Sequence, residues 1–425
     1  MKISVIGTGY VGLVSGVCLA EKGHQVTCVD SDQDKIDKIN LGIPPIYEQG
    51  LQDLLGKNLN TTLFANTDLK SAVLGSEVSI IAVGTPFNGD QIDLGAIKRV
   101  SEQIGKILAQ KNSYHVIVVK STVVPGTTDE MVCPLLEQAS GKKAGIDFGV
   151  GMNPEFLREG EAVLDFLLPD RIVLGGMDQR TRGVMGQIYT FFPDTEIIST
   201  TNKTAEMIKY AANSLLATMI SFSNEIANLC TSLGDIDVNE VLKGVHLDKR
   251  LSPILQDGSR VVPALTTYLH AGCGFGGSCF PKDVKALIAH GKKMGARMEL
   301  LEAVININSR QPQEILKILK QYFPSLEDRK ITVLGLAFKP GTDDMRESPA
   351  IPIINSLLKD RAKISADDPV ASLEAKKIFG NNQIEYYDNL RISLQEAEAV
   401  LVLTRWDEFM TLPDLLTDLK LAPLV

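Results

Sequence analysis

The sequence predicts an α/β protein with two parallel sheets that are joined by a long central helical region. Two observations support this fold class. Short apolar runs alternate with helical patterns in the first 200 residues and again from Arg329 onward, a rhythm that is typical of parallel sheets. Between these halves, helical periodicity extends from Lys203 to Leu233 and from about Leu300 to Tyr322. We therefore expect three domains, comprising residues 1–200, 201–322 and 323–425.

The composition is that of an ordinary globular protein, with 425 residues of which 44% are hydrophobic and 22% charged. The net charge of −9 argues against a nucleic acid or an acidic membrane as the main partner, although a local basic cluster can still bind an anionic small molecule. The six cysteines show no metal-ligand spacing, so we expect free thiols and no metal. The chain opens directly on a strand and contains no long apolar run, which predicts a cytoplasmic protein without a signal peptide or a membrane span.

The first predicted strand leads directly into a glycine-rich turn. The run from Lys2 to Ile6 is followed by Gly7-Thr8-Gly9-Tyr10-Val11-Gly12 and an apolar helical pattern, and a second strand, 25–29, ends at Asp30. In a Rossmann-like domain such glycines admit a pyrophosphate to the helix N-terminus, and the acid binds the ribose hydroxyls. A tight turn without a ligand is the alternative for the glycines alone. The sequence thus predicts an NAD site, because Asp30 would repel the 2′-phosphate of NADP.

Four further apolar runs predict the next strands of the first sheet, at residues 78–83, 116–120, 147–151 and 171–175. Ligands in parallel α/β sheets bind at the carboxyl ends of the strands, so the residues directly after each run are candidates for a site. These candidates are Gly84–Pro86, Lys120–Thr122 and Asn153–Glu159. Taken singly, each segment is equally consistent with ordinary turn chemistry.

The first long helical stretch carries Lys209 and Asn213, which are four residues apart and therefore share one face of the helix. Such a polar pair normally lies on a solvated face. Here its neighbours, Ala211-Ala212 and Leu215-Leu216, are apolar, so we expect both polar side chains to point into a buried environment. The two long helices also offer a surface on which a dimer could form.

A glycine-rich segment after this helix carries the strongest signal for a nucleophile. Four glycines between Gly272 and Gly277 leave the backbone accessible, and Pro281 can begin a helix. Cys279 then sits at the N-terminus of that helix, where the macrodipole and the nearby Lys282 favour a thiolate. A lone cysteine more often packs as a small apolar side chain. We keep that interpretation for Cys273, which has no helix start behind it.

A second α/β unit begins near Arg329. The strand Lys330–Leu334 leads into a loop with Lys339, and two later strands, 362–366 and 399–403, continue the same alternating pattern. This half echoes the first without its glycine fingerprint. We therefore expect a second Rossmann-like sheet that binds a different nucleotide through Lys339.

Seven motifs, which succeed one another almost from end to end of the chain, resemble those of the UDP-glucose/GDP-mannose dehydrogenase family: GTGYVG, VGTP, KSTV, NPEFLREG, KYAAN, GFGGSCFPKD and GLAFKPGTDDMRES. The resemblance implies NAD-dependent four-electron oxidation of UDP-glucose to UDP-glucuronate, with two NAD for each sugar, in polysaccharide biosynthesis. GDP-mannose or another UDP-hexose is the alternative substrate, whereas GFGGSCFPKD argues against the N-acetylmannosamine branch. The resemblance also implies a homodimer or a higher homo-oligomer.

The resemblance further implies three groups of site residues. The catalytic residues are the nucleophile Cys279, its polar partners Lys209, Asn213 and Asp283, and, at the reacting carbon, Thr122 and Glu155. The NAD contacts are Gly7, Gly9, Tyr10, Val11, Gly12, Asp30, Lys35, Thr85, Thr122, Glu159 and Arg346. The nucleotide-sugar contacts are Glu155, Phe156, Leu157, Lys209, Asn213, Arg250 (which reaches a neighbouring subunit), Tyr268, Phe275, Gly276, Phe338 and Lys339.

The chemistry explains why such a reaction uses a cysteine. A primary alcohol becomes an acid by losing two hydrides, and Lys209, Asn213 and a water held by Asp283 can assist the first loss. A thiolate at Cys279 then adds to the aldehyde, because a thiohemiacetal yields a second hydride readily, and Glu155 is a candidate to activate the water that hydrolyses the resulting thioester. The alternative from another class is a binding protein that senses NAD and a nucleotide sugar through Cys279.

Overall fold

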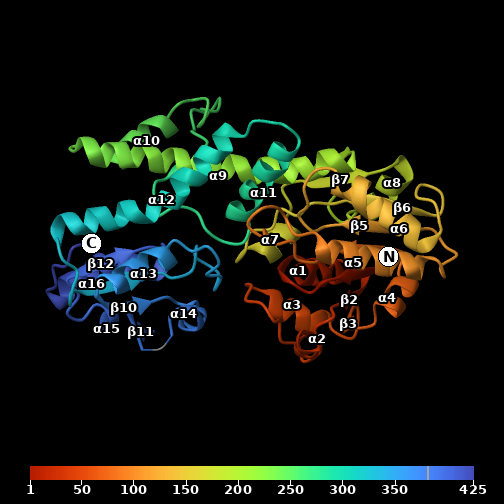
Figure 1. Ribbon diagram of the computed structural model, residues 1–425, viewed down its shortest axis with the longest axis horizontal. Coiled ribbons are helices and arrows are strands. Elements are labelled where there is room, and N and C mark those ends of the chain that lie inside the picture. Colours follow the sequence, from red (N-terminus) through yellow and green to blue (C-terminus); the bar gives the residue numbers. More distant parts are fainter. Residues whose placement is uncertain (381) are drawn as a thin grey trace. The chain divides into compact units, whose positions relative to one another are not determined.

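The computed structural model describes residues 1–380 and 382–425, and it divides into two compact units, residues 1–211 and 212–425. One long helix, α9 (Asn202–Leu233), runs from the first unit into the second and is drawn in green in Figure 1. It begins one residue before the predicted stretch. The predicted organisation into three domains stays a prediction.

Within the described residues, the first unit contains one sheet of eight strands in the order β3-β2-β1-β4-β5-β6-β7-β8. Its strands are β1 (Lys2–Ile6), β2 (Gln25–Val29), β3 (Leu63–Asn66), β4 (Val78–Ile81), β5 (His115–Val119), β6 (Phe148–Met152), β7 (Ile172–Gly176) and β8 (Ile197–Thr200). All but one of the neighbouring pairs are parallel. The predicted α/β class with a parallel-dominated sheet is therefore confirmed.

One pair of strands departs from the predicted parallel rhythm. β6 and β7 are antiparallel, with Gly151 opposite Gly176. Antiparallel strands are joined without crossing the sheet, so the connection from residue 153 to residue 171 begins and ends at the carboxyl end of β6. The candidate segment Asn153–Glu159 lies in this connection and stays at the edge where the parallel strands end.

Helices cover both faces of this sheet. They are α1 (Tyr10–Glu21), α2 (Gln33–Asn40), α3 (Leu51–Asn58), α4 (Leu69–Gly75), α5 (Gly95–Leu108), η1 (Thr128–Val132), α6 (Cys133–Ser140), α7 (Ala162–Leu167) and α8 (Gln179–Ile188). Alternate strand residues pack on opposite faces: Val5 lies in one apolar cluster with Leu13 of α1, and Ile6 lies in another with Ile104 of α5. Because both faces are buried, the central strands read as continuous apolar runs.

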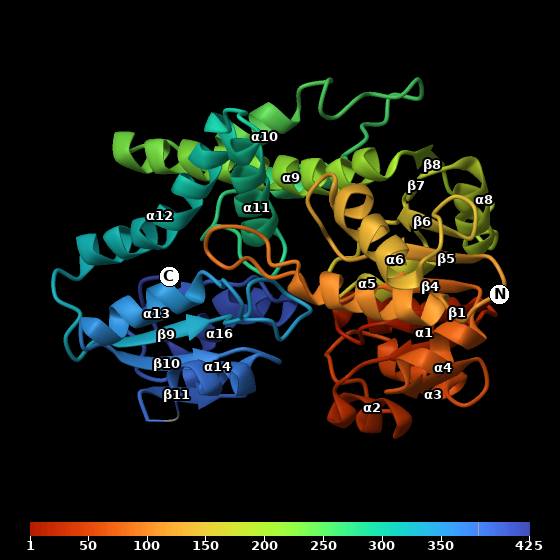
Figure 2. The same ribbon diagram turned by 45° about the vertical axis from the view of Figure 1, so that its right-hand side comes forward.

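Within the described residues, the second unit contains a sheet of four parallel strands in the order β11-β10-β9-β12, drawn in blue in Figure 2. Its strands are β9 (Lys330–Leu334), β10 (Lys363–Asp367), β11 (Ile384–Tyr387) and β12 (Ala399–Val402). Its helices are α10 (Val238–His246), η2 (Ala264–Leu269), α11 (Phe280–Lys293), α12 (Glu299–Tyr322), α13 (Ala350–Lys359), α14 (Ser372–Phe379), α15 (Leu390–Ser393), η3 (Asp407–Thr411) and α16 (Leu412–Leu419). The predicted second parallel sheet is confirmed.

A small apolar cluster fixes the glycine-rich segment within the second unit. Ala217 of α9, Val284 of α11 and Val304 of α12 pack together with Phe275, and each of the four is buried. The cluster thereby determines where the backbone enters α11. The start of this helix directly after Cys279 confirms the predicted helix start.

Three strands that the sequence did not predict lie at sheet edges. β3, β8 and β11 are short, and each has partly or fully exposed residues in place of a continuous apolar run. In the part of the chain that the structure describes, no helix combines the length and the apolar character that a membrane span requires.

Candidate active site

The glycine fingerprint closes the turn between β1 and α1. Gly7 has φ +97°, and its N–H donates to the carbonyl of Val29 at 2.7 Å. A side chain at Gly12 would collide with the carbonyl of Gly7, so glycine allows the helix to pack closely on the strand. At Gly9, the N-cap of α1, an added Cβ would meet nothing within 4 Å, and no side chain caps the helix. This open helix N-terminus suits a pyrophosphate.

Asp30 lies at the end of β2 beside that turn. Its Oδ2 accepts hydrogen bonds from the backbone N–H and the hydroxyl of Thr8, both at 2.8 Å, and its Oδ1 accepts one from the N–H of Asp32 at 3.0 Å. Burial raises the pKa of Asp30, but these hydrogen bonds and Lys35, 4.0 Å away, outweigh it and leave the pKa below its usual range. An ionised carboxylate here fits the ribose hydroxyls of NAD.

Tyr10 is tied to a distant loop through Glu48, a residue that the sequence analysis did not single out. The Tyr10 hydroxyl donates to Glu48, whose carboxylate accepts the N–H groups of Gly160 and Ala162, both at 2.7 Å. Burial and this hydrogen bond raise the pKa of Tyr10. Glu159, which is buried, directly precedes Gly160 in the loop that the Glu48 carboxylate connects to Tyr10 of α1. Glu48 has no local sequence signal, since its partners are far along the chain.

The ends of β4 and β5 are joined by side-chain hydrogen bonds. The Thr85 hydroxyl donates to the carbonyl of Thr122 at 2.7 Å, and the Ser121 hydroxyl donates to the carbonyl of Val83 at 2.7 Å. Thr85 is 7% exposed. The structure thus brings Thr85 and Thr122 together at the strand ends.

Glu155 and Lys209 form a buried ion pair in the first unit. Glu155 Oε1 lies 2.9 Å from Lys209 Nζ, and both side chains are 5% exposed. Glu155 Oε2 accepts the N–H of Leu157 at 2.7 Å. Burial raises the pKa of Glu155, but Lys209 and the Leu157 N–H lower it by more, so its pKa is below the usual range. The predicted buried environment of Lys209 is confirmed.

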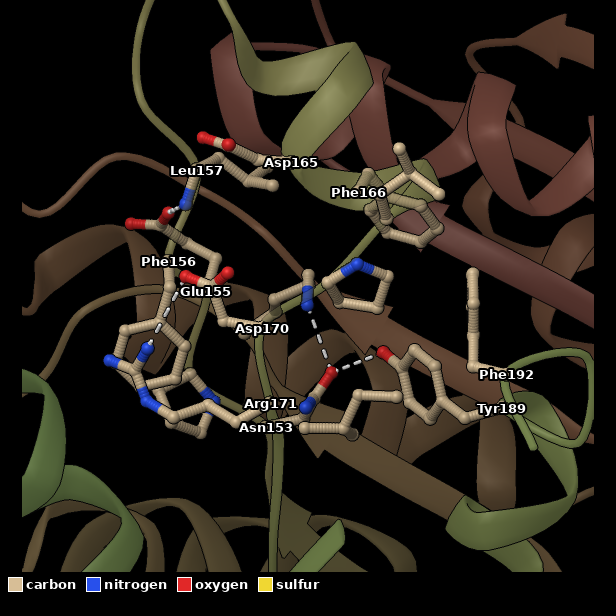
Figure 3. A pocket seen from close by; sticks show the side chains of 15 residues that line it. Asn153, Glu155, Phe156, Leu157, Asp165, Phe166, Asp170, Arg171, Tyr189 and Phe192 are labelled. Carbon is tan, nitrogen blue, oxygen red and sulfur yellow. Dashed lines mark hydrogen bonds and ion pairs between the residues drawn. The ribbon is translucent and has the colours of Figure 1, made fainter. Parts of the chain in front are cut away.

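A pocket of about 60 Å³ lies beside this ion pair and is shown in Figure 3. The segment from Asn153 to Leu157 forms part of its wall, and the guanidinium of Arg171 lies 3.9 Å from the centre of the Phe156 ring. In Figure 3 the carboxylate of Glu155 lies beside Leu157, and the ring of Phe156 lies beside Arg171.

In the second unit, Cys279 is the N-cap of α11 and is partly buried. Its Sγ lies 3.6 Å from the Ser278 hydroxyl. The N–H of Gly277 donates to the carbonyl of Arg346 at 2.8 Å, and a side chain at Gly276 would collide with the carbonyl of Glu347. The glycines therefore let the segment before Cys279 lie directly on the loop after β9.

Asp283, one turn into α11, is bound on both carboxylate oxygens. Asn213 Nδ2 donates to its Oδ2 at 2.6 Å, and Lys282 Nζ lies 2.5 Å from its Oδ1. Asp283 is 1% exposed. Lys282, which the sequence placed near the thiol, thus has Asp283 as its partner.

Burial raises the pKa of Cys273 to about 11, which supports a packing role for that residue.

The loop after β9 carries the predicted residues Phe338, Lys339 and Arg346. The Lys339 ammonium lies 6.0 Å from the centre of the Phe338 ring, and Arg346 forms a two-pronged contact with Asp344 at 2.9 and 2.7 Å. The N–H of Phe338 donates to the carbonyl of Asp344 at 3.1 Å, which closes the loop.

Two further residues, Tyr268 and Arg250, were predicted to contact the nucleotide sugar. The ring of Tyr268 packs 6.3 Å from that of Phe280 in the first turn of α11. Arg250 lies after α10, its side chain is 88% exposed, and it pairs with Asp248 at 2.5 Å. Among the contacts of the described residues, Arg250 meets no other predicted site residue. No group of three or more His, Cys, Asp or Glu side chains suited to a metal ion occurs within residues 1–380 and 382–425.

Family profiles match three successive parts of the chain. They are the UDP-glucose/GDP-mannose dehydrogenase family's NAD binding domain over residues 1–193, its central domain over 203–310 and its UDP binding domain over 332–424. The predicted family and its NAD cofactor are thereby confirmed.

Similar proteins include enzymes for more than one nucleotide sugar. The UDP-glucose 6-dehydrogenase AglM of Haloferax volcanii is 42% identical over 97% of this chain and 93% of its own. The GDP-mannose 6-dehydrogenase of Pseudomonas aeruginosa is 41% identical over 96% and 92%. The solved UDP-glucose dehydrogenase of Pyrobaculum islandicum, 37% identical over 96% and 90%, superposes with a TM-score of 0.88. This chain belongs to the UDP-glucose/GDP-mannose dehydrogenase family of NAD-dependent nucleotide-sugar 6-dehydrogenases.

Proposed function

We propose that the chain oxidises UDP-glucose to UDP-glucuronate and reduces two NAD for each sugar. The observation that carries the proposal is the position of Cys279 at the N-terminus of α11. The glycine-rich segment before it packs on the loop after β9, which contains Lys339. A dehydrogenase that removes only one hydride has no use for a nucleophilic thiol, whereas an alcohol-to-acid oxidation needs one. The UDP binding domain profile and the UDP-glucose 6-dehydrogenase relatives support UDP-glucose as the substrate.

Most of the NAD contacts in this proposal come from the first unit. The glycines from Gly7 to Gly12, including Gly9, leave room for the pyrophosphate, and Asp30 accepts hydrogen bonds from the adenosine ribose. We assign the remaining contacts to Tyr10, Val11, Lys35, Thr85, Thr122, Glu159 and Arg346. When bound, NAD supplies the hydride acceptor for both oxidations.

The first oxidation depends on polar side chains from α9 and α11. Asn213 and Asp283 are hydrogen bonded to each other, and Lys209 is bound to Glu155, so each is held in one orientation. We assign Lys209 and Asn213 to stabilise the charge that develops on the sugar oxygen, and Asp283 to hold the water that accepts the proton. Thr122 orients the sugar at the reacting carbon.

The second oxidation depends on Cys279. Its thiolate attacks the aldehyde, a C–S bond forms, and loss of the second hydride leaves a thioester. Glu155, which is ionised and fixed by the Leu157 N–H, then accepts a proton from the attacking water. The C–S bond breaks, the acid leaves, and the thiol is regenerated.

Contacts with the nucleotide sugar complete this proposal. Lys339 binds the pyrophosphate and Phe338 packs near it, and two further contacts with the nucleotide sugar are assigned to Phe275 and Gly276. Further contacts are assigned to Phe156, Leu157, Tyr268 and Arg250. Arg250 is highly exposed, which suits a contact made in a homodimer.

GDP-mannose is the second candidate, because a GDP-mannose 6-dehydrogenase is nearly as similar in sequence. A panel of UDP-glucose, GDP-mannose and UDP-N-acetylmannosamine, each mixed with NAD, separates the candidates by NADH formation. We expect the highest kcat/KM with UDP-glucose and a uronic acid product in mass spectrometry. A higher kcat/KM with GDP-mannose would replace the proposed substrate, and no NADH with any nucleotide sugar would refute the proposed function.

A further inference from the structure

Asn153 connects three strands and a helix at the point where the first sheet changes from parallel to antiparallel pairing. Its Oδ1 accepts hydrogen bonds from Lys120 Nζ at 2.9 Å and from Tyr189 Oη at 2.5 Å, and its Nδ2 donates to the carbonyl of Val173 at 2.9 Å. Figure 3 shows Asn153 and Tyr189 facing each other inside the pocket. Because both lone pairs of Oδ1 are used, the orientation of the carboxamide is set.

Lys120 brings a positive charge into this buried network. It lies directly after β5 and is 4% exposed. Burial lowers the pKa of Lys120 to about 8, while the charge of Glu155 opposes this shift and that of Lys209 adds to it. The carboxamide of Asn153 satisfies a hydrogen bond but carries no charge to offset a buried ammonium group. An apolar side chain of similar length would avoid this desolvation, so the lysine has a role beyond packing.

The other carboxylates that line the pocket already have cationic partners. Asp165 Oδ1 lies 2.6 Å from the guanidinium of Arg158, and Asp170 lies 4.0 Å from that of Arg171. Glu155 is the carboxylate whose charge acts on Lys120. Glu155 is therefore the carboxylate of the pocket lining to which Lys120 is coupled. Tyr189 adds no charge there, because burial raises the pKa of its phenol.

Glu155 is shared between two lysines. Burial raises its pKa, and Lys209, the Leu157 N–H and then Lys120 lower it. Lys120, Glu155 and Lys209 are all buried, so two ammonium groups and one carboxylate form a buried cluster. When both lysines are protonated, this cluster carries one excess positive charge. That excess favours the ionised form of Glu155.

We propose that Lys120 is a positioning residue of the reaction site, which orients the Glu155 loop through Asn153 and keeps the Glu155 carboxylate ionised. The inference rests on the proposed function, in which Glu155 activates water. Lys120 acts through Asn153 and Glu155, and not on the sugar itself. Its hydrogen bond fixes Asn153, directly before Pro154, and its charge acts on the carboxylate of Glu155, directly after Pro154.

Three variants separate charge from packing. Lys120→Met removes the charge and the hydrogen bond, Tyr189→Phe removes a hydrogen bond to the same oxygen without a charge, and Lys120→Arg keeps the charge. The pH profile of kcat is measured with whichever nucleotide sugar the wild type oxidises. We expect the acid limb to move up by about 0.5–1 pH unit in Lys120→Met, because the pKa of Glu155 rises when a neighbouring cation is lost. In Tyr189→Phe and in Lys120→Arg, we expect the acid limb of the kcat profile to lie at the same pH as in the wild type.

A uniform loss of activity in Lys120→Met at every pH, without a shift of the limb, would overturn the inference. It would show a role in folding alone.

A second measurement needs no turnover and no variant of Lys120. Protein with ¹⁵N-labelled lysine is titrated by NMR in the wild type and in Glu155→Gln, with the Lys120 Nζ resonance identified by its shift in Tyr189→Phe. We expect Lys120 to titrate near the value of about 8 in the wild type and lower in Glu155→Gln, because the compensating charge is gone. An equal midpoint in both proteins would overturn the coupling. Absence of NADH formation with every nucleotide sugar would refute the proposed function and leave this titration unaffected.

Discussion

The turns after β1 and β9, the first strand of each sheet along the chain, have the same backbone hydrogen bond. In the first unit, Gly7 has φ +97° and its N–H donates to the carbonyl of Val29 at the end of β2, at 2.7 Å. In the second unit, Gly335 has φ +86° and its N–H donates to the carbonyl of Asp367 at the end of β10, at 2.8 Å. Both turns need a glycine, because few other residues adopt this left-handed conformation.

The next N–H in each turn is bound by an acid at the end of the neighbouring strand. Thr8 donates to Asp30 Oδ2 at 2.8 Å in the first unit, and Leu336 donates to Asp368 Oδ2 at 2.7 Å in the second. Up to this residue the two turns are built alike, although only the first has the glycine fingerprint.

The two turns lead into different elements of the chain. β1 ends at Ile6 and α1 begins at Tyr10, whereas β9 ends at Leu334 and α13 begins only at Ala350. The first turn therefore presents a helix N-terminus, while the second presents a long loop with Lys339. Under the proposed function, one strand-turn arrangement binds phosphate groups through backbone N–H groups in the first unit and through a side-chain cation in the second.

The two acids also differ in their remaining capacity to bind a ligand. Asp368 is 3% exposed and accepts the N–H groups of Ala337, Val370 and Ala371 and the indole N–H of Trp406, in addition to that of Leu336. Asp30 is only partly buried and accepts three hydrogen bonds from Thr8 and Asp32. Asp368 is thus saturated by the protein, whereas Asp30 retains room for a ribose hydroxyl.

The largest effect is expected for Asp368→Ala. Loss of the carboxylate leaves several buried N–H groups without an acceptor, and we expect unfolding of the second unit to become easier by about 3 kcal/mol or more. Urea denaturation, monitored by circular dichroism so that unfolding of both units is followed, measures the change. Asp30→Ala is the matched control, for which we expect a loss of stability of at most about 1 kcal/mol. Equal losses in the two variants would contradict the distinction between a saturated acid and a ligand-binding one.

Lys339→Ala tests the side-chain mode of phosphate recognition. A charge-assisted contact with a pyrophosphate contributes about 1.5–3 kcal/mol, so we expect the Kd for UDP-glucose to rise by about tenfold or more while NAD binding is unchanged. Calorimetry with each ligand measures both values. Lys363→Ala, which removes a lysine at the start of β10, controls for the change in net charge. Weakened NAD binding with an unchanged UDP-glucose Kd would assign the loop to the wrong ligand.

Asp30→Asn tests the ribose contact that we propose for the first unit. The wild type should prefer NAD to NADP by at least about tenfold in kcat/KM, because Asp30 repels the 2′-phosphate. The amide removes this repulsion, so the preference should shrink. Comparable values for both cofactors in the wild type would show that Asp30 does not face the ribose.

The smallest effect is expected at Asp367, next to the saturated acid. Burial and the charge of Asp368 raise the pKa of Asp367 to about 6 from an ordinary value of 3.8. The folded state therefore holds this proton more tightly than the unfolded state, and the ionised carboxylate lowers stability at pH values above about 6. Asp367→Asn should raise Tm by a few degrees at pH 7.5 and by little at pH 4. An equal change at both pH values would exclude titration of Asp367 as the cause.

The sequence predicted those elements whose signal is local. The central strands are buried on both faces and read as apolar runs, and the turn at Gly7 and the helix start after Cys279 have short, directional signatures. The edge strand β8 was missed because its residues alternate between exposed and half-buried. The antiparallel β6–β7 pair was also missed, since strand direction is set by how the connection packs and not by the apolar pattern.

The candidate site was predicted only as far as its residues have local signals or motifs. Glu48 and Tyr189 bind partners that lie many residues away, Tyr10 and Gly160 in one case and Asn153 in the other. No periodicity or spacing indicates such contacts. Asn153 was predicted only as the first residue of the candidate segment Asn153–Glu159, and the hydrogen bonds by which its carboxamide connects three strands were not foreseen.

The central claim is that Cys279 captures the aldehyde and so couples two oxidations. The most direct measurement is the NADH yield per UDP-glucose at completion, for the wild type and for Cys279→Ala, with mass spectrometry of the quenched protein. We expect two NADH per sugar and no free aldehyde from the wild type, and no uronic acid from Cys279→Ala, because alanine cannot form the thiohemiacetal. One NADH per sugar from the wild type, or undiminished uronic acid from Cys279→Ala, would contradict the account.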